Sequence, residues 1–316
     1  SGGIKTTLHN LGTEYGKIGH EFIYVVPGKK FSREKTEHGG CITLPSWTIP
    51  FSGGYRVIRS TRQVKTILQS LKPDRLEVSD RFTLLKVGRW AKQQKIASLV
   101  FSHETLNGLV QKFVPIIPSS IRNRFVNWHN AKLAATFDNV IATTDFAAAE
   151  FVRIKTNNLR KVALGVDLIG FTPENRNYKL RKELLKGAEF LLVHCGRMSP
   201  EKQPERSVQA LAELIKRGVN ARLIIVGGGP LWNKVRKQST GLPVDMVGYI
   251  ASRQKVADYL AAADLAIAPG PLETFCLSAL ESLASGTPVV ASKSSAVGEI
   301  LNVNSIKAAG AVAADD

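Results

Sequence analysis

The chain has 316 residues, of which 44% are hydrophobic, and its formal net charge is +17. This length is natural for two domains, and the composition is ordinary for a globular protein with buried cores. No run of about 18 apolar residues occurs, which argues against a membrane-spanning helix. The three cysteines, Cys41, Cys195 and Cys276, lie far apart without metal-binding spacing or a disulfide framework, as in proteins of a reducing cytosol.

The positive charge is concentrated in the first part of the chain. Residues 1–172 contain 25 Lys and Arg against 12 Asp and Glu, a net +13, whereas residues 173–316 contain 18 against 14, a net +4. This imbalance predicts an anionic partner: lipid headgroups, nucleic acid or a phosphorylated substrate. A generally basic proteome or a solubility effect would produce the same charge.

The first half of the chain alternates strand-like and helical patterns irregularly. Candidate strands lie at 22–26, 42–44, 75–78, 98–101, 139–142 and 161–164. Gly2 and Gly3 open a helical pattern without a strand before them, although a Gly-Gly turn of this kind normally follows a strand. We therefore expect a piece trimmed at both ends that lacks its first strand. A leftover of an expression tag at residues 1–3 is the alternative.

A basic helix with an apolar loop before it is predicted in the same half. Residues 55–71 are expected to form a helix with Arg56, Arg59 and Arg62 at three-residue spacing. The preceding loop, 44–51, is apolar and includes Trp47. Together they could rest on an anionic bilayer, whereas the alternative is an ordinary surface helix beside a packed loop.

The second half alternates strand and helix regularly. Strands are predicted at 190–193, 222–226, 244–247, 265–268 and 289–291, and helices at 204–217, 231–238, 252–262, 277–285 and 295–301. This alternation is typical of βαβ units and a parallel sheet. A polar segment at 171–177 is a plausible linker, so we predict two doubly wound α/β domains, 1–172 and 173–316. The default ligand site is then the cleft between them, at the carboxyl ends of the strands.

The segment from Gly270 to Glu281 is the most informative stretch of the sequence. It follows a buried strand, and a helix is expected to begin near Leu277. Glu273 would then lie beside the helix N-terminus, where unsatisfied N–H groups attract an anion, and Glu281 would lie one turn in. Two carboxylates around an anion site suit a nucleotide sugar. The alternative is a helix-terminal glutamate and a solvated one.

Several motifs together resemble one enzyme family. They are Ser1–Ile4, Gly53–Arg56, Pro73–Arg81, Phe101–Glu104, Gly165–Asp167, Gly196–Lys202, Val226–Pro230 and the segment from Glu273 to Glu281. Over nearly its whole length the chain resembles retaining glycosyltransferases of family 4, which have the two-domain GT-B fold. Among them it is most similar to GDP-mannose-dependent α-mannosyltransferases of actinobacterial envelope lipid synthesis.

The resemblance implies a role for each motif. His103, Glu273, Arg197 and Lys202 would be catalytic: the two cations hold the donor diphosphate, and Glu273 and a neutral His103 bind hydroxyls of the transferred sugar. Further donor contacts are implied for Gly2, Gly3, Gly228, Phe275, Cys276, Leu277 and Glu281, with Glu281 on the ribose and most of the others acting through backbone N–H groups. Cys276 departs from the usual glycine of the family, and a Cys nucleophile is the less favoured alternative.

The resemblance also implies the reaction. It is retaining glycosyl transfer without a metal ion or other cofactor, most favourably of mannose from GDP-mannose to a lipid or glycolipid acceptor, in the cytoplasm and peripherally on the inner face of the cell membrane. Acceptor or membrane contacts are expected at Trp47, Tyr55, Arg56, Arg59 and Arg62. No nucleic-acid partner is expected. The alternatives are a UDP-sugar enzyme with a soluble acceptor, a sugar-nucleotide epimerase or hydrolase on the same fold, a basic module that binds anionic surfaces, and an inactive fragment.

Overall fold

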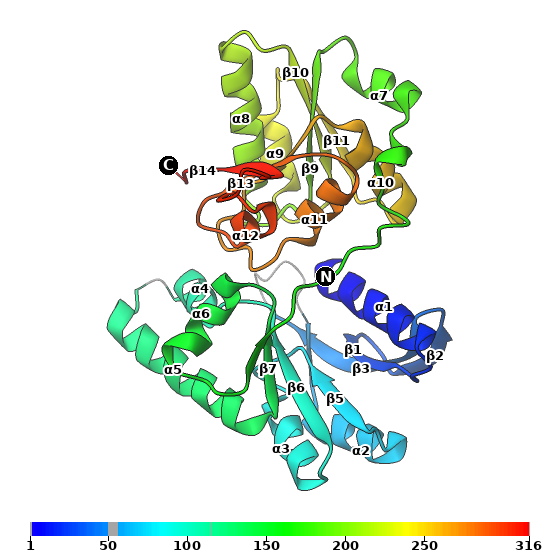
Figure 1. Ribbon diagram of the computed structural model, residues 1–316, viewed down its shortest axis with the longest axis vertical. Helices are drawn as coiled ribbons and strands as arrows, with labels where there is room; N and C mark the ends of the chain where they lie inside the picture. The colour runs from blue at the N-terminus through cyan, green and yellow to red at the C-terminus, as the bar shows by residue number, and fades with distance from the viewer. Residues whose placement is uncertain (1, 50–55, 115, 316) are drawn as a thin grey trace. The chain divides into compact units, whose positions relative to one another are not determined.

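The computed structural model describes residues 2–49, 56–114 and 116–315 (Figure 1). The chain divides into two compact units, residues 1–164 and 165–316. The polar segment 171–177 belongs to the second unit, because Phe171 is buried in its core and Pro173 packs against Gly286. Among the described residues, none of the helices is both long enough and apolar enough to cross a lipid bilayer.

The second unit is built on one parallel sheet of six strands in the order β11-β10-β9-β12-β13-β14. Its elements are η1 (Pro173–Asn175), α7 (Tyr178–Leu185), β9 (Phe190–Cys195), α8 (Pro204–Lys216), β10 (Ala221–Val226), α9 (Trp232–Gln238), β11 (Val244–Gly248), α10 (Arg253–Ala262), β12 (Leu265–Ala268), α11 (Leu277–Ala284), β13 (Val289–Ser292), α12 (Val297–Leu301) and β14 (Gly310–Ala313). From the centre of the sheet, the strands β9, β10 and β11 follow one another towards one edge, and β12, β13 and β14 follow one another towards the other edge. The neighbouring strands β9 and β12 therefore mark a topological switch point.

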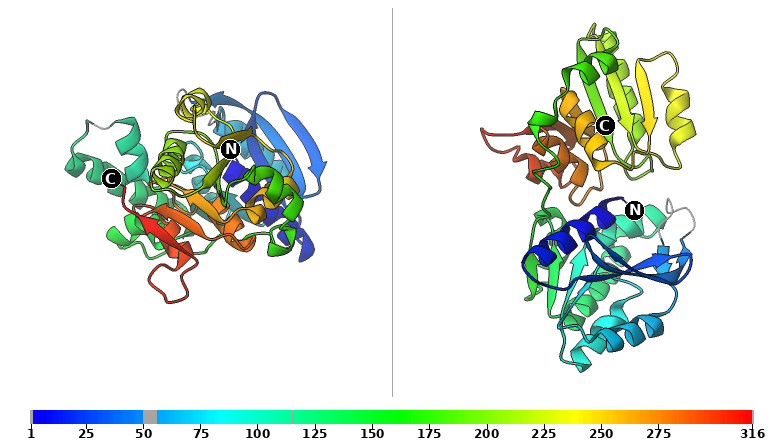
Figure 2. Two further views of the ribbon diagram at one scale, coloured as in Figure 1. Left: turned by 90° about the horizontal axis from the view of Figure 1, so that it is seen from above. Right: turned by 90° about the vertical axis from the view of Figure 1, so that its right-hand side faces the viewer.

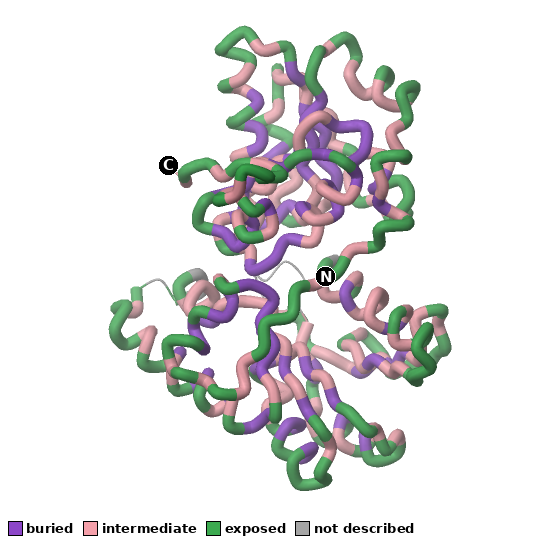
Figure 3. The backbone as a smooth tube through the Cα atoms, viewed as in Figure 1, coloured by how far each residue is buried: buried purple, intermediate pink, exposed green. Residues whose placement is uncertain are grey.

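Helices cover both faces of this sheet, as Figure 2 shows. Leu191 and Val193 of β9 pack with α10, α11 and α12 on one face, whereas Leu192 packs with α8 and α9 on the other. Alternate residues of a strand point to opposite faces, so a strand covered on both must be apolar throughout. This is why Leu191, Leu192 and Val193 of β9 form a continuous apolar run. They are buried in the middle of the second unit, where Figure 3 shows buried segments.

The strands of the first unit form two sheets. A parallel sheet has the order β5-β6-β7-β8, and a mixed sheet has the order β1-β3-β2 with β4 paired to β3. The elements are α1 (Gly2–Lys17), β1 (Ile23–Gly28), β2 (Ser32–Thr36), β3 (Gly39–Thr48), β4 (Arg56–Ile58), α2 (Thr61–Leu71), β5 (Arg75–Val78), α3 (Leu85–Gln93), β6 (Ala97–Ser102), α4 (Leu106–Phe113), α5 (Ser119–Thr136), β7 (Asn139–Ala142), α6 (Asp145–Arg153) and β8 (Leu159–Lys161).

The prediction of one helix from residue 55 to 71 is wrong. Residues 56–58 form β4, which pairs antiparallel with residues 46–48 of β3, so Trp47 also lies in a strand and not in a loop. The helix begins only at Thr61, because the Ser60 hydroxyl accepts the Gln63 N–H and caps it. Arg56, Arg59 and Arg62 therefore lie in a strand, a turn and a helix. Tyr55 lies outside the described residues.

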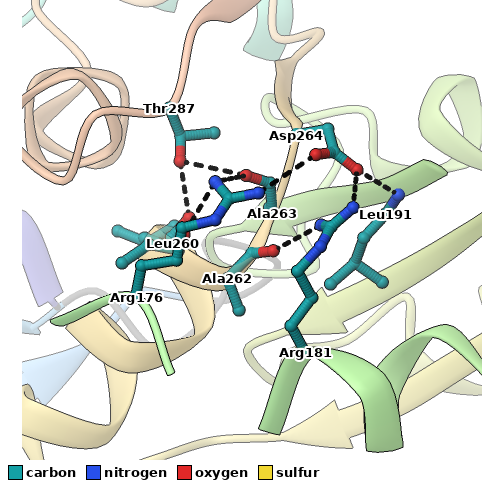
Figure 4. A network of polar contacts seen from close by, with 9 residues as sticks. Arg176, Arg181, Leu191, Leu260, Ala262, Ala263, Asp264 and Thr287 are labelled. Carbon is teal, nitrogen blue, oxygen red and sulfur yellow. Dashed lines mark hydrogen bonds and ion pairs between the residues drawn. The ribbon is translucent and has the colours of Figure 1, made fainter. Parts of the chain in front are cut away.

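A polar network fixes the start of the second unit to the end of α10 (Figure 4). Arg181 donates to the Ala262 carbonyl and to Asp264, both at 2.8 Å, and Arg176 lies 3.4 Å from the other Asp264 oxygen. The Leu191 N–H also donates to Asp264 at 2.8 Å. The arginines thus satisfy carbonyls that the end of α10 leaves without helical partners, while Asp264 joins β12 to β9.

Replacing Asp264 with alanine should destabilise the second unit by about 2 kcal/mol, because two partly buried guanidinium groups and the Leu191 N–H lose their acceptor. Urea unfolding measures the change. Asp258→Ala, on the preceding helix α10, is the matched control, since Asp258 accepts an exposed hydrogen bond from Gln254. Equal stability of the Asp264 variant and wild type would contradict the role of this network.

Candidate active site

The loops that follow β9 and β12 lie at the switch point of the second unit. Both strands end at the same edge of the sheet because they pair in parallel, Leu265 with Leu192 and Ala266 with Val193. The first loop contains Arg197 and Lys202, and the second contains Glu273 and leads into α11. In open α/β sheets, ligands bind outside the carboxyl ends of strands at this point.

Backbone packing holds the first loop against the loop that follows β10. Gly196 N donates to Val226 O at 2.9 Å, and Met198 N donates to Gly228 O at 3.0 Å. A Cβ on Gly227, whose φ is +138°, would lie 1.8 Å from Gly196 O. Glycine is therefore required at Gly227 for structural reasons, whereas a Cβ on Gly228 would meet Tyr249 at 3.9 Å, an ordinary van der Waals contact.

Lys202 and Glu273 form an ion pair across the switch point. The Lys202 ammonium contacts the Glu273 carboxylate, whose side chain is 11% exposed. Burial lowers the pKa of Lys202, but the charge and hydrogen bond of Glu273, together with Cys276 and Glu201, outweigh this effect, so the pKa lies above its usual value. A permanent cation is thus available at the sheet edge, held by a carboxylate that follows the neighbouring strand.

Cys276 begins α11 in a left-handed conformation, with φ of 66°. Only glycine adopts this conformation without steric cost, which explains in physical terms why glycine is expected here. The Cys276 thiol is buried, 3.4 Å from the Ser278 hydroxyl, and burial together with the charge of Glu273 raises its pKa to about 11. It is protonated at neutral pH, which disfavours a role as nucleophile.

Glu281 is buried on α11 and pairs with an arginine that sequence analysis did not select. Arg253, at the start of α10, donates to Glu281 at 2.6 Å, and its guanidinium lies 4.5 Å from the ring centroid of Phe171. Burial raises the pKa of Glu281, and Arg253 opposes the rise. Arg253 is 28 residues away in sequence, so neither motif nor spacing connects it with Glu281.

In the first unit, His103 directly follows β6. Its Nε2 lies 3.1 Å from the Ser79 hydroxyl, which follows the neighbouring strand β5, and its ring stacks on Phe101. Burial lowers the pKa of His103 to about 4. The imidazole is neutral at neutral pH and can make a hydrogen bond without introducing charge.

A buried ion network positions the loop that contains His103. Arg81 donates to the Glu104 carbonyl at 2.7 Å and to the Ser102 hydroxyl. Glu150 accepts the N–H groups of Leu106 and its neighbour at the start of α4, at 3.0 and 2.6 Å. Arg81 was part of a recognised motif but had no predicted role; its function in holding this loop is visible only in the tertiary structure.

The other predicted site residues lie on the following elements. Gly2 and Gly3 begin α1, and Phe275 and Leu277 flank Cys276 at the start of α11. In the first unit, the Arg59 guanidinium lies 5.5 Å from the ring centroid of Trp47, whose side chain is exposed. Arg56 donates to the Ser46 hydroxyl at 2.8 Å, so it contacts the strand next to its own.

Two α/β units, each with a parallel sheet, are the architecture expected of a glycosyltransferase with the GT-B fold. Residues 1–169 match the profile described as Glycosyltransferase Family 4, and residues 175–315 match Glycosyl transferases group 1. The chain therefore belongs to glycosyltransferase family 4, and the resemblance found in the sequence is confirmed.

Three comparisons illustrate this relationship. The chain is 45% identical over 306 residues to the GDP-mannose-dependent alpha-(1-6)-phosphatidylinositol dimannoside mannosyltransferase of Mycobacterium tuberculosis H37Ra, covering 96% of this chain and 79% of the relative. It is 28% identical to the alpha-monoglucosyldiacylglycerol synthase of Streptococcus pneumoniae, covering 92% and 67%. The structure of sucrose-phosphate synthase from Thermosynechococcus elongatus has a TM-score of 0.76 at 20% identity, covering 100% of this chain and 81% of that one. This last similarity confirms the fold.

Arg253→Ala should make stability more sensitive to pH. Without the guanidinium, the pKa of buried Glu281 rises further, so the folded variant holds a proton more tightly than the unfolded chain does. Its free energy of unfolding should therefore fall relative to wild type as pH rises from mildly acidic to mildly alkaline. Urea unfolding across this range measures the difference. Adding Glu281→Gln should remove it, and a pH-independent difference would contradict the pairing.

The native thiols should react slowly with iodoacetamide. Burial raises the pKa of Cys195 to about 12 and that of Cys276 to about 11, and Cys41 is buried as well. At mildly alkaline pH we expect labelling at least about tenfold slower than in the urea-unfolded chain, because the thiolate is the reactive form. Mass spectrometry identifies the labelled residue. Rapid modification of native Cys276 would support the alternative of a nucleophilic cysteine.

Proposed function

We propose that this chain transfers mannose from GDP-mannose to a lipid-linked acceptor, with retention of anomeric configuration and without a metal ion. The observation that supports the proposal most is the Lys202–Glu273 ion pair at the switch point. The donor and acceptor classes are proposed by analogy with the mycobacterial mannosyltransferase that is 45% identical to this chain.

Lys202 and Arg197 are proposed to bind the diphosphate of the donor. Negative charge grows on the leaving diphosphate as the glycosidic bond breaks, and a fixed cation stabilises it most in the transition state. Lys202 is suited to this role because it is already charged and held by Glu273 before the donor binds. The backbone N–H groups of Phe275, Cys276 and Leu277 at the start of α11 are proposed as further phosphate and sugar donors.

The carboxylates are proposed to bind hydroxyl groups. Glu273 would accept hydrogen bonds from the transferred sugar, and Glu281 from the ribose. In the first unit, His103 is proposed to bind a sugar hydroxyl as a neutral imidazole, with Gly2 and Gly3 offering backbone N–H groups to the phosphates. Gly228, in the loop that follows β10, is proposed as a contact of the donor.

In the proposed reaction, the acceptor hydroxyl attacks the anomeric carbon on the same face that the diphosphate leaves. The bond from that carbon to the phosphate oxygen breaks, the new bond to the acceptor oxygen forms, and the acceptor proton passes to the leaving phosphate oxygen. The chain contributes position and charge, and no covalent enzyme intermediate is required.

The acceptor is proposed to be a glycolipid at the inner face of the cell membrane. Arg56 and Arg59, with Trp47 beside Arg59, are proposed to contact its anionic headgroup together with Arg62 and Tyr55. The guanidinium groups suit a phosphodiester, and an exposed indole suits the boundary between headgroup and acyl chain.

Lys202→Ala should reduce the rate of transfer about a hundredfold or more, because the charge on the leaving diphosphate loses its fixed cation. Transfer of radiolabelled mannose to a lipid extract measures the rate. Lys234→Ala is the matched control, since Lys234 also forms an ion pair in the second unit, with Glu205, at 2.8 Å on an exposed surface. Equal losses in both variants would refute the role given to Lys202.

The stereochemical outcome tests the reaction itself. We expect an α-linked product from the α-linked donor, as determined by NMR spectroscopy, and an unchanged rate in the presence of a chelator. A β-linked product would refute the same-face mechanism, and loss of transfer in the chelator that is restored by magnesium would refute metal independence.

A further inference from the structure

Helix α5 of the first unit exposes an apolar stripe. Ile121, Phe125 and Trp128 follow one another at four- and three-residue intervals, and their side chains are 61%, 45% and 58% exposed. These intervals place them on one face of the helix. Upstream, Ile116 between α4 and α5 is 92% exposed. We name Ile116, Ile121, Phe125 and Trp128 the α5 patch.

Helix α5 buries Val126 and Leu133 in the core of the first unit and also buries two polar side chains. Asn130 is wholly buried and donates to Glu150 at 3.1 Å, and His129 is 8% exposed. The aromatic residues Phe125 and Trp128 lie outside this buried set, whereas a helix that only covers a core would bury its aromatic residues and expose its amides. Helices α4 and α6 pack against α5 (Figure 1), and the stripe remains exposed beside them.

The charged residues in the segment of sequence that contains the α5 patch are all basic. From Thr105 to Phe137 the sequence contains Lys112, Arg122, Arg124 and Lys132 and no Asp or Glu. The Lys132 ammonium lies 4.9 Å from the ring centroid of Trp128, and the Phe125 and Trp128 rings are 6.1 Å apart. Exposed aromatic rings flanked by cations are the composition of a helix that lies in a lipid interface.

A second copy of the chain is a poorer occupant of this surface. In a two-fold symmetric contact the same patch faces itself, so Arg124 and Lys132 would approach their own copies. The helix offers no acidic side chain to neutralise them, and like charges across an interface oppose association. An anionic bilayer provides both the apolar layer for the rings and the negative headgroups for the cations.

We propose that the α5 patch docks the first unit on an anionic lipid bilayer. The rings of Phe125 and Trp128 enter the boundary between headgroups and acyl chains, and Arg124 and Lys132 contact lipid phosphates. This surface differs from the Trp47–Arg59 contact. This proposal extends the proposed function. It rests on that function only for the location of the acceptor in a membrane.

Two variants with matched changes test the proposal. Trp128→Gln with Arg124→Glu and Lys132→Glu removes one exposed ring and reverses two charges on α5. Tyr178→Gln with Lys179→Glu and Lys182→Glu makes the same changes on α7, where Tyr178 is 77% exposed. Both lower the net charge equally. Co-sedimentation with vesicles of phosphatidylcholine and phosphatidylglycerol should fall at least about tenfold for the α5 variant and remain at the wild-type level for the α7 variant.

Tryptophan fluorescence provides a second readout that does not require a disruptive variant. Brominated lipids should quench the wild-type fluorescence, and Trp128→Phe should remove a part of this quenching that Trp47→Phe leaves in place. Vesicle binding of the α5 variant at the wild-type level, or an equal loss in the α7 variant, would overturn the proposal. A dimer in sedimentation velocity that only the α5 variant dissociates, without vesicle binding by wild type, would assign the patch to a second copy instead.

Calorimetric titration with GDP-mannose separates this proposal from the proposed function. Donor binding should be the same in wild type and both variants, because α5 provides none of the proposed donor contacts. If none of the three proteins binds the donor but the α5 variant alone loses vesicle binding, the proposed function fails and the docking surface stands.

Discussion

The neighbouring positions of β9 and β12 are the constraint on which the site depends. The strands that follow β9 lie on one side of this pair, and those that follow β12 lie on the other. The loops after β9 and β12 therefore leave the same sheet edge side by side. Lys202 and Glu273, 71 residues apart in sequence, meet there as an ion pair. The apolar strands beneath, covered by helices on both faces, fix the two loops relative to each other. The network of Asp264 with Arg176 and Arg181 secures the base of β12 in the same way.

In the second unit, partly buried charged groups are paired with groups of opposite charge. Burial alone would lower the pKa of Lys202 and raise that of Glu281, and in each case a neighbour of opposite charge acts against it. These groups are thus charged and held in place without a ligand, which would limit reorganisation on binding of the proposed diphosphate. In the first unit, by contrast, burial keeps His103 neutral. The Arg81–Glu150 network holds the loop that contains it.

The regular parts of this fold could be predicted from sequence, because short apolar or alternating runs between helical patterns indicate strands. The strands at 75–78, 139–142 and 265–268 have the predicted bounds, and α11 begins at Leu277 as expected. Prediction failed at 55–71, where residues 56–58 have too few side chains to show a period and pair with a strand only through tertiary structure. The roles of Arg253 and Arg81 could not be predicted either, because their partners are distant in sequence and a local pattern does not indicate such contacts.

The central claim is that the switch point of the second unit binds a GDP-sugar through fixed charges. Thermal unfolding with a panel of GDP-, UDP- and ADP-linked sugars, with and without magnesium, tests it most directly. A ligand at 100 times its dissociation constant stabilises the protein that binds it by about 2.7 kcal/mol. We predict that GDP-mannose alone raises the melting temperature, with or without magnesium, and that Lys202→Ala abolishes the rise. A cooperatively unfolding protein with no response to GDP-mannose, or with a response retained in Lys202→Ala, would contradict this account.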